Sequence, residues 1–261
     1  MSMLVVPGAL LLSLAADGAA AATGFEPLAA VGAATEAADG AAAPPLHCTG
    51  DRRWCARIDR AEARLVLTER AGEDAGAGRS WALPLPEDGI DDHEVWPHLR
   101  IEADGAVLAG VLRRRGTGFA GGSESSAELV LVRLPADRSA LSEAGELPVS
   151  GGADIRACFD ADDRRARLGA CSDEYEFTAS IAAEPVDGAP AELRLETRAR
   201  TFPGRRSRTE DSLAGPPLRR GDLVWAEDAE CSYRRRFTFD AASGRYRPDE
   251  ALPECSNYFG F

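Results

Sequence analysis

The chain has 261 residues, a net charge of −13 at pH 7 and six cysteines. This acidity argues against a nucleic-acid binder, because contact with phosphates needs a basic surface, and it disfavours anionic membranes for the same reason. The length allows one large domain or two small ones.

The N-terminal residues have the pattern of an export signal. Residues 4–16 form an apolar segment of the length found in signal peptides, and the alanines at 19–22 supply small residues for cleavage, although no Lys or Arg precedes the apolar segment. We therefore expect residues 1–22 to be a signal peptide. The mature protein would then be periplasmic or secreted, with no integral membrane insertion once the signal is removed.

The next segment, residues 23–47, is rich in Ala, Gly and Pro and shows no periodicity. This composition predicts a disordered linker. A β domain is expected over residues 48–261. Residues 135–152, where Pro, Gly and Ser interrupt the strand pattern, mark the boundary if this domain consists of two subdomains.

Two of the three histidines lie within residues 91–98. Asp91, His93 and His98 are ligand types that zinc or another transition metal accepts. On a regular strand the two imidazoles would point to opposite faces, so shared coordination needs a bend, for which Pro97 is a candidate. The favoured alternative is a polar turn that enters a strand, with Trp96 in the core.

Three features of β structure follow along the chain. Residues 99–112 predict a hairpin, because Asp104 and Gly105 suit a type I′ turn, and Ile101 would then face Leu108. The glycine-rich residues 116–125 predict a mobile loop whose exposed Phe119 contacts a partner. The continuous apolar run at 127–134 predicts a strand that is covered on both faces.

The best candidate for a helix is residues 160–168, which begin with acidic residues, continue with arginines and are followed by Gly169. Helix is otherwise scarce.

A second hairpin is predicted by the alternation of apolar and polar residues in 174–181 and 193–200. If the apolar faces align, Glu176 lies opposite Arg198 and Glu174 lies opposite Arg200. A third hairpin is expected over residues 232–247.

Arginine clusters recur along the chain, and solvated ion pairs are their favoured role. The best group for an anionic ligand is Arg205, Arg206 and Arg208, because these residues share a loop with Pro203 and Gly204.

The spacing of the six cysteines favours pairing between sequence neighbours. The predicted disulfides are Cys48–Cys55, Cys158–Cys171 and Cys231–Cys255. A redox or zinc role is disfavoured, because no Cys-x-x-Cys motif occurs and the spacings do not suit a zinc ribbon. No cofactor is predicted.

About ten to twelve short strands with turn signals between them predict a mainly β protein: an antiparallel sandwich, barrel-like or propeller-like array that is stapled by disulfides. Because no catalytic motif is recognised, the leading functional hypothesis is a non-catalytic binding or envelope-associated module. Its partner would be an envelope protein, a glycan or a small anionic ligand. The alternatives are a metal-dependent hydrolase that uses Asp91, His93 and His98, and a purely structural spacer.

Overall fold

The computed structural model describes residues 21–31, 45–70, 78–86, 92–206 and 211–259. Over these residues the predicted fold class is confirmed, because the chain is mainly antiparallel β and builds a sandwich-like arrangement of two sheets rather than a closed barrel. No described helix is long and apolar enough to cross a membrane.

The larger sheet has twelve strands. They are β1 (Ala21–Thr23), β2 (Glu26–Pro27), β8 (Asp92–Val95), β9 (His98–Ile101), β10 (Val107–Phe119), β11 (Gly122–Leu134), β12 (Ser142–Arg156), β13 (Ser172–Val186), β14 (Ala189–Phe202), β15 (Ala226–Glu227), β16 (Arg234–Asp240) and β17 (Arg245–Pro248). The smaller sheet has five, in the spatial order β3 (Ala29–Val31), β4 (Leu46–Cys48), β5 (Trp54–Asp59), β6 (Arg64–Glu69) and β7 (Arg79–Pro84).

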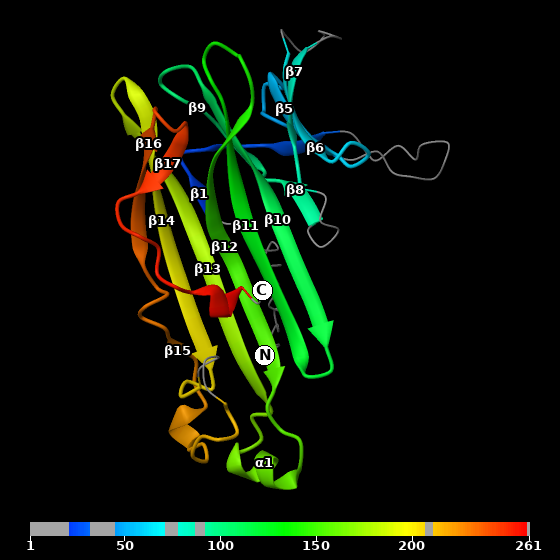
Figure 1. Ribbon diagram of the computed structural model, residues 1–261, viewed down its shortest axis with the longest axis vertical. Coiled ribbons are helices and arrows are strands. Elements are labelled where there is room, and N and C mark those ends of the chain that lie inside the picture. Colours follow the sequence, from blue (N-terminus) through cyan, green and yellow to red (C-terminus); the bar gives the residue numbers. More distant parts are fainter. Residues whose placement is uncertain (1–20, 32–44, 71–77, 87–91, 207–210, 260–261) are drawn as a thin grey trace, which may run out of the picture.

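Five long strands, β10 to β14, run side by side through the length of the molecule (Figure 1). The small sheet lies at one end of these strands, and the short helix α1 (Ala161–Ala166) lies at the other. Two single turns of 3₁₀ helix, η1 (Arg220–Asp222) and η2 (Ser256–Tyr258), follow later in the chain.

Strand β11 is covered on both faces, as its apolar run predicts. Leu129 and Leu131 belong to one hydrophobic core, whereas Val130 and Val132 belong to a second. Alternate side chains of a strand point to opposite faces, so β11 separates the two cores. Its neighbour β10 divides its side chains between the cores in the same way.

The first core fills the space where the large sheet folds over itself. Strands β12 and β13 pair only between Ser150–Thr178 and Arg156–Ser172, and beyond that point β13 pairs with β1 instead. The C-terminal segment crosses this core, and the Tyr258 ring contacts the rings of both Tyr175 and Phe177.

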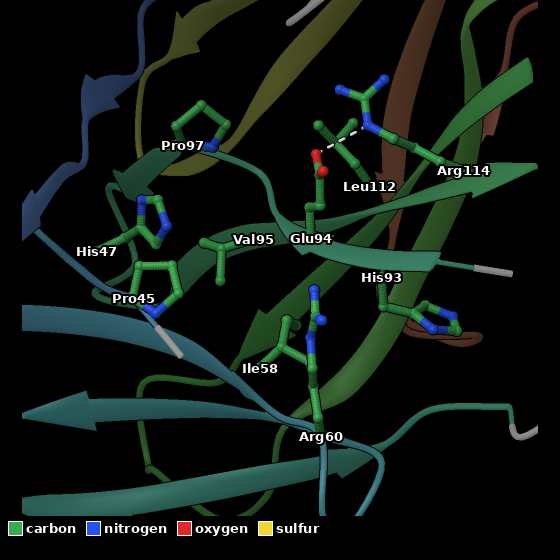
Figure 2. A pocket seen from close by; sticks show the side chains of 10 residues that line it. All are labelled: Pro45, His47, Ile58, Arg60, His93, Glu94, Val95, Pro97, Leu112 and Arg114. Carbon is green, nitrogen blue, oxygen red and sulfur yellow. Dashed lines mark hydrogen bonds and ion pairs between the residues drawn. The ribbon is translucent and has the colours of Figure 1, made fainter. Parts of the chain in front are cut away.

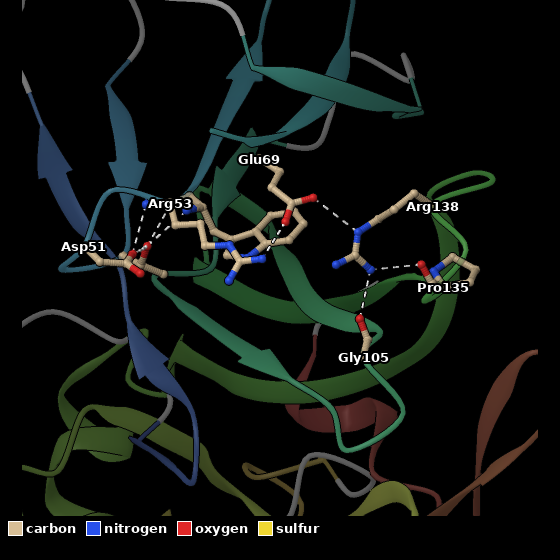
Figure 3. A network of polar contacts seen from close by, with 8 residues as sticks. Asp51, Arg53, Glu69, Gly105, Pro135 and Arg138 are labelled. Carbon is tan, nitrogen blue, oxygen red and sulfur yellow. Dashed lines mark hydrogen bonds and ion pairs between the residues drawn. The ribbon is translucent and has the colours of Figure 1, made fainter. Parts of the chain in front are cut away.

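The second core lies between β9–β11 and the small sheet, which contributes Trp54, Leu65, Leu67 and Trp81. Arg138 joins the two sheets at the edge of this core (Figure 3). Its guanidinium donates to the carbonyls of Gly105, at 2.8 Å, and Pro135, at 3.1 Å, and pairs with Glu69 of β6 at 3.3 Å.

All three predicted disulfides are present. They close loops over sequence separations of 7, 13 and 24 residues. Such short closures stabilise the fold by roughly 2–4 kcal/mol each on the chain-entropy model.

The expected disordered linker is wrong for the two ends of residues 23–47 that the structure describes. Strands β2 and β3 lie in this segment, β1 ends in it, and β4 begins in it. The sequence pattern missed them because each strand is too short to show a period. Two apolar side chains hold the segment in place, since Phe25 is buried in the first core and Leu28 in the second.

The predicted hairpin of β13 and β14 is present, but its predicted register is wrong by two residues. Glu176 lies opposite Arg200 and Glu174 lies opposite Phe202. A shift of two residues keeps the apolar faces aligned, so alternation alone cannot select the register. The register is set jointly by the tight turn at Asp187 and Gly188, where Val186 pairs with Ala189, and by the irregularity between Glu184 and Val186, which shifts the pairing by one residue.

The hairpin of β9 and β10 also forms, with a turn different from the predicted one. Ile101 pairs with Val107 rather than Leu108. Of the two turn residues, only Gly105 has a positive φ, of 84°, so the turn is not type I′. The amide of Gly105 donates to the Glu102 carbonyl, which closes a four-residue turn.

Two expected interruptions of the strand pattern are absent. Residues 116–125 are not a loop, because β10 runs to Phe119 and β11 starts at Gly122. Residues 142–152 lie within the continuous strand β12, so no subdomain boundary falls there. Gly151 fits this strand because a Cβ atom would lie 2.4 Å from the Tyr258 carbonyl oxygen.

The predicted helix, shorter than the expected 160–168, and the third hairpin are present. Helix α1 begins after Asp160, whose carboxylate accepts from the amides of Asp162 and Asp163, and Gly169 follows it with a φ of 87°. Strands β16 and β17 form the hairpin expected over 232–247.

Candidate functional site

One candidate site combines apolar and charged side chains: a cleft at the edge of β8 that faces away from β10, with a volume of about 410 Å3. We call it the β8 cleft. It is lined by Pro45, His47, Ile58, Arg60, His93, Glu94, Val95, Pro97, Leu112 and Arg114. These residues come from both sheets. His47 lies on β4 and Ile58 lies on β5. The three residues 93–95 lie on β8, Pro97 follows β8, and residues 112 and 114 lie on β10.

Local structure fixes each wall of this cleft. On the side of the small sheet, His47 directly precedes Cys48, whose disulfide to Cys55 holds β4 against β5. On the side of the large sheet, β8 pairs with β10, so Glu94 lies opposite Leu112 and His93 lies opposite Arg113. Figure 2 shows His47 and Arg60 entering the cleft across from Glu94 and Arg114.

Glu94 and Arg114 form an ion pair in the cleft, with 2.8 Å between Oε2 and Nε (Figure 2). Burial lowers the pKa of His47, and the nearby Glu94 carboxylate offsets part of this effect. The imidazole is therefore neutral at pH 7, and its ring nitrogens can donate one hydrogen bond and accept another.

Arg60 supplies the least engaged positive charge of the cleft. Its side chain is 73% exposed, and its guanidinium lies 3.6 Å from the Asp92 carboxylate, which is itself 63% exposed. A contact of this kind is worth little in water. Arg60 is therefore free to exchange its partner for a carboxylate or phosphate of a ligand.

The remaining walls are apolar, from Ile58, Val95, Leu112 and the two prolines. None of the ten described lining residues is Ser, Thr or Cys, so these ten residues provide no hydroxyl or thiol nucleophile. The guanidiniums of Arg60 and Arg114 face the single carboxylate of Glu94 among the lining residues. The arrangement suits an anionic ligand that also carries an apolar part.

The structure separates the two histidines that the sequence proposes as metal ligands. His93 lies on β8 and lines the cleft, whereas His98 lies on β9, is not a lining residue, and has its ring centre 5.0 Å from that of Trp96. Burial lowers the pKa of His98. Trp96 is fully buried in the core, as expected. Asp91 lies outside the described residues, and among those described no three His, Cys, Asp or Glu side chains form a metal-binding group.

The arginine group lies at the opposite end of the molecule. Arg205 and Arg206 line a smaller cavity of about 160 Å3, and Arg208 lies outside the described residues. Both guanidiniums have partners in the protein: Arg205 lies 3.7 Å from the Asp222 carboxylate, and Arg206 donates to the Pro216 carbonyl at 2.9 Å. Of the two, only Arg206 has a hydrogen bond at a normal distance. The proposed anion site at this arginine group stays a prediction.

Phe119 stands at the tip of the hairpin of β10 and β11, with 48% of its surface exposed. It lies far along β10 from the cleft, because β8 pairs with residues 111–114. The proposed partner contact at Phe119 stays a prediction.

Sequence reasoning missed His47, Arg60 and Arg114 as members of one site. They are 13 to 67 residues apart, and only the packing of the small sheet on the large one brings them together. One local signal was present for His47: the residue beside a disulfide-bonded cysteine in a short loop is held in place by the disulfide.

No protein-family model, no curated protein and no solved structure matches this chain. The functional argument therefore rests on the geometry of the cleft.

Proposed function

We propose that this protein is an exported, non-catalytic binding module, periplasmic or secreted, whose ligand occupies the β8 cleft. The observation that carries the proposal is the cleft itself, which has a volume of about 410 Å3 and two guanidiniums in a chain of net charge −13. Volumes of roughly 300–1,000 Å3 with mainly apolar walls and a few polar groups are typical of ligand sites.

Of the partner types expected from the sequence, the cleft favours an anionic ligand. Its apolar walls, Val95, Ile58 and Leu112, contribute to affinity by removing apolar surface from water. Arg60 and the pair of Arg114 and Glu94 set the orientation. A ligand with a carboxylate, sulfonate or phosphate and an apolar part uses both kinds of wall.

The export part of the proposal draws on two independent features. The N-terminal apolar segment has the pattern of a signal peptide. In addition, all six cysteines are paired, which is usual for proteins that fold in an oxidising compartment.

The test uses 8-anilinonaphthalene-1-sulfonate, a fluorescent organic anion with apolar rings, titrated into the disulfide-bonded mature protein. We expect saturable binding of one probe per chain. Replacing Arg60 by Ala should weaken it by about tenfold, the order expected for loss of one charge-assisted contact.

Arg198→Ala is the matched control. Arg198 is 68% exposed and lies 3.9 Å from the Glu227 carboxylate, so it resembles Arg60 in exposure and in its loose ion pair but lies on β14. Its loss should leave probe affinity unchanged. Equal effects of the two substitutions, or the absence of saturable binding, would rule out the cleft as the binding site.

A further inference from the structure

The backbone of β8 offers unpaired hydrogen-bonding groups to the cleft. Among the described residues, β8 pairs with β10 alone. The Trp96 amide donates to the Gly110 carbonyl, so these two residues form a hydrogen-bonded pair. Hydrogen-bonded and non-hydrogen-bonded pairs alternate along an antiparallel ladder, and the backbone groups of residues 94 and 96 therefore point toward β10. The N–H and C=O groups of His93 and Val95 therefore point away from β10, and no described residue bonds to them.

The same edge is already paired one step further along the chain. Strand β2 runs antiparallel to β9, and the Leu28 amide donates to the Pro97 carbonyl at 2.8 Å. After Leu28 the chain leaves this edge and enters β3 of the small sheet. The protein's own strand thus occupies the edge as far as Pro97, and within the described part of the chain no strand pairs with Val95 and His93 on this side.

We propose that the ligand of the β8 cleft is an extended polypeptide segment that adds to this edge as a strand antiparallel to β8, in continuation of β2. The inference rests on the proposed function and specifies the ligand. Strand addition supplies affinity through main-chain hydrogen bonds, and the cleft supplies specificity through alternate side chains. An exposed edge is otherwise a liability that proteins cover or blunt with charge.

The walls define which segment fits. A residue opposite Val95 shares the face of Val95, which packs in the second core with Ile58, so an apolar side chain suits this position. Two residues further along, opposite His93, an acidic side chain suits the position because Arg60 extends toward β8 there (Figure 2). The motif is an apolar residue, any residue, then Asp or Glu.

The test measures binding of an N-acetylated pentapeptide, Val-Thr-Glu-Thr-Thr, labelled with fluorescein at its C-terminal end, by anisotropy. The peptide starts at the Val because Leu28 already occupies the place opposite Pro97. We expect saturable binding that weakens at least about tenfold when the peptide Val is N-methylated, because its N–H faces β8. N-methylation of the following Thr is the matched control, since its N–H faces away from β8. This control should bind within about twofold of the parent peptide.

On the protein, His93→Pro removes an outward N–H without removing a bond of the β8–β10 ladder, a position where an edge strand tolerates proline. It should weaken peptide binding about tenfold or more, whereas His93→Ala, which keeps the N–H, should have an effect within about threefold. Arg60→Glu should reverse the preference for the Glu peptide over its Lys counterpart. Circular dichroism verifies that each variant is folded.

The outcomes separate this inference from the proposed function. Binding of the naphthalene sulfonate at the cleft without peptide binding would leave the proposed function standing and overturn strand addition. Peptide binding that tolerates both Val N-methylation and His93→Pro would overturn it as well. Failure of both probes would overturn the two proposals together.

Discussion

The most completely buried charged pair is formed by Arg167 and Asp173, whose side chains are 2% and 3% exposed. Arg167 also donates to the Ser212 hydroxyl at 2.5 Å and to the Ala170 carbonyl at 2.7 Å. One side chain thus joins three segments beside the Cys158–Cys171 disulfide. Its partners satisfy the guanidinium fully enough to offset the cost of burying it.

Arg167→Met should lower the free energy of unfolding by about 3–5 kcal/mol, because it leaves the Asp173 carboxylate buried without its partner. Urea unfolding measures the change. The control is Arg165→Ala: Arg165 pairs with Asp162 on the surface, with 77% and 82% exposure, and should lose at most about 1 kcal/mol. A loss at Arg167 no larger than that at Arg165 would contradict the prediction.

Glu102 is a buried carboxyl whose Oε2 accepts from the Ala191 amide at 2.6 Å. Burial raises its pKa above the usual value of 4.5, against the opposing hydrogen bond from Ala191 and the charge of Arg100. Because the folded protein binds this proton more tightly than the unfolded chain, the contribution of Glu102 is most favourable below pH 4.5. It is lost as the pH rises through the raised pKa.

Glu102→Gln removes this titration while keeping an amide oxygen for the Ala191 N–H. Relative to the variant, the wild-type protein should lose unfolding free energy as the pH rises from about 4.5 toward 7. Urea unfolding of both proteins at several pH values gives the difference directly. A difference that is constant with pH, or that changes in the opposite direction, would show that burial does not control this carboxyl.

At the scale of elements, the sequence predicts those parts that follow from local chemistry. Residues 127–134 become a strand with both faces covered, and Asp160 caps the predicted helix. Register is different, because a two-residue slip between β13 and β14 keeps the apolar faces aligned, and the turn together with the irregularity beside it decides the pairing. The β8 cleft could not be predicted in the same way, since it needs the small sheet docked against β8.

The C-terminal segment, whose regular structure is the single 3₁₀ turn η2, covers the first core. Tyr258 is 1% exposed and donates its hydroxyl to Asp228 at 2.8 Å, and the disulfide of Cys231 and Cys255 holds the segment in place. The segment therefore covers the aromatic side chains that β13 contributes to the first core.

Tyr258→Ala should cost about 3–5 kcal/mol of unfolding free energy, the range for loss of a large buried aromatic side chain. Tyr258→Phe, which removes only the hydroxyl, should cost about 1–3 kcal/mol, because the Asp228 carboxylate loses its donor. Thermal and urea unfolding provide the measurement. An equal loss of unfolding free energy in the two variants would mean that the hydrogen bond to Asp228, and not the packing of the ring, keeps the C-terminal segment on the core.

For the molecule as a whole, the decisive feature is that β10 and β11 serve both cores. Leu129 packs in the first core, and its neighbour Val130 packs in the second. Neither core can lose its packing without exposing one face of these strands. The Arg138 contacts strengthen this coupling, because they join the small sheet to the two turns at one end of the shared layer, before β10 and after β11.

The shared layer predicts a single unfolding transition for the disulfide-bonded protein. Leu67 is fully buried in the second core and Leu195 in the first. Leu67→Ala and Leu195→Ala should each lower the unfolding free energy by about 2–5 kcal/mol and move the whole transition. Trp96 lies in the first core, so it is replaced by Phe for this experiment. Tryptophan fluorescence then reports mainly on the second core through Trp54 and Trp81, and far-ultraviolet circular dichroism reports on all strands. The two signals should coincide in both variants. If Leu67→Ala instead shifted fluorescence alone, the small sheet would unfold independently, and the β8 cleft would open without unfolding of the long strands.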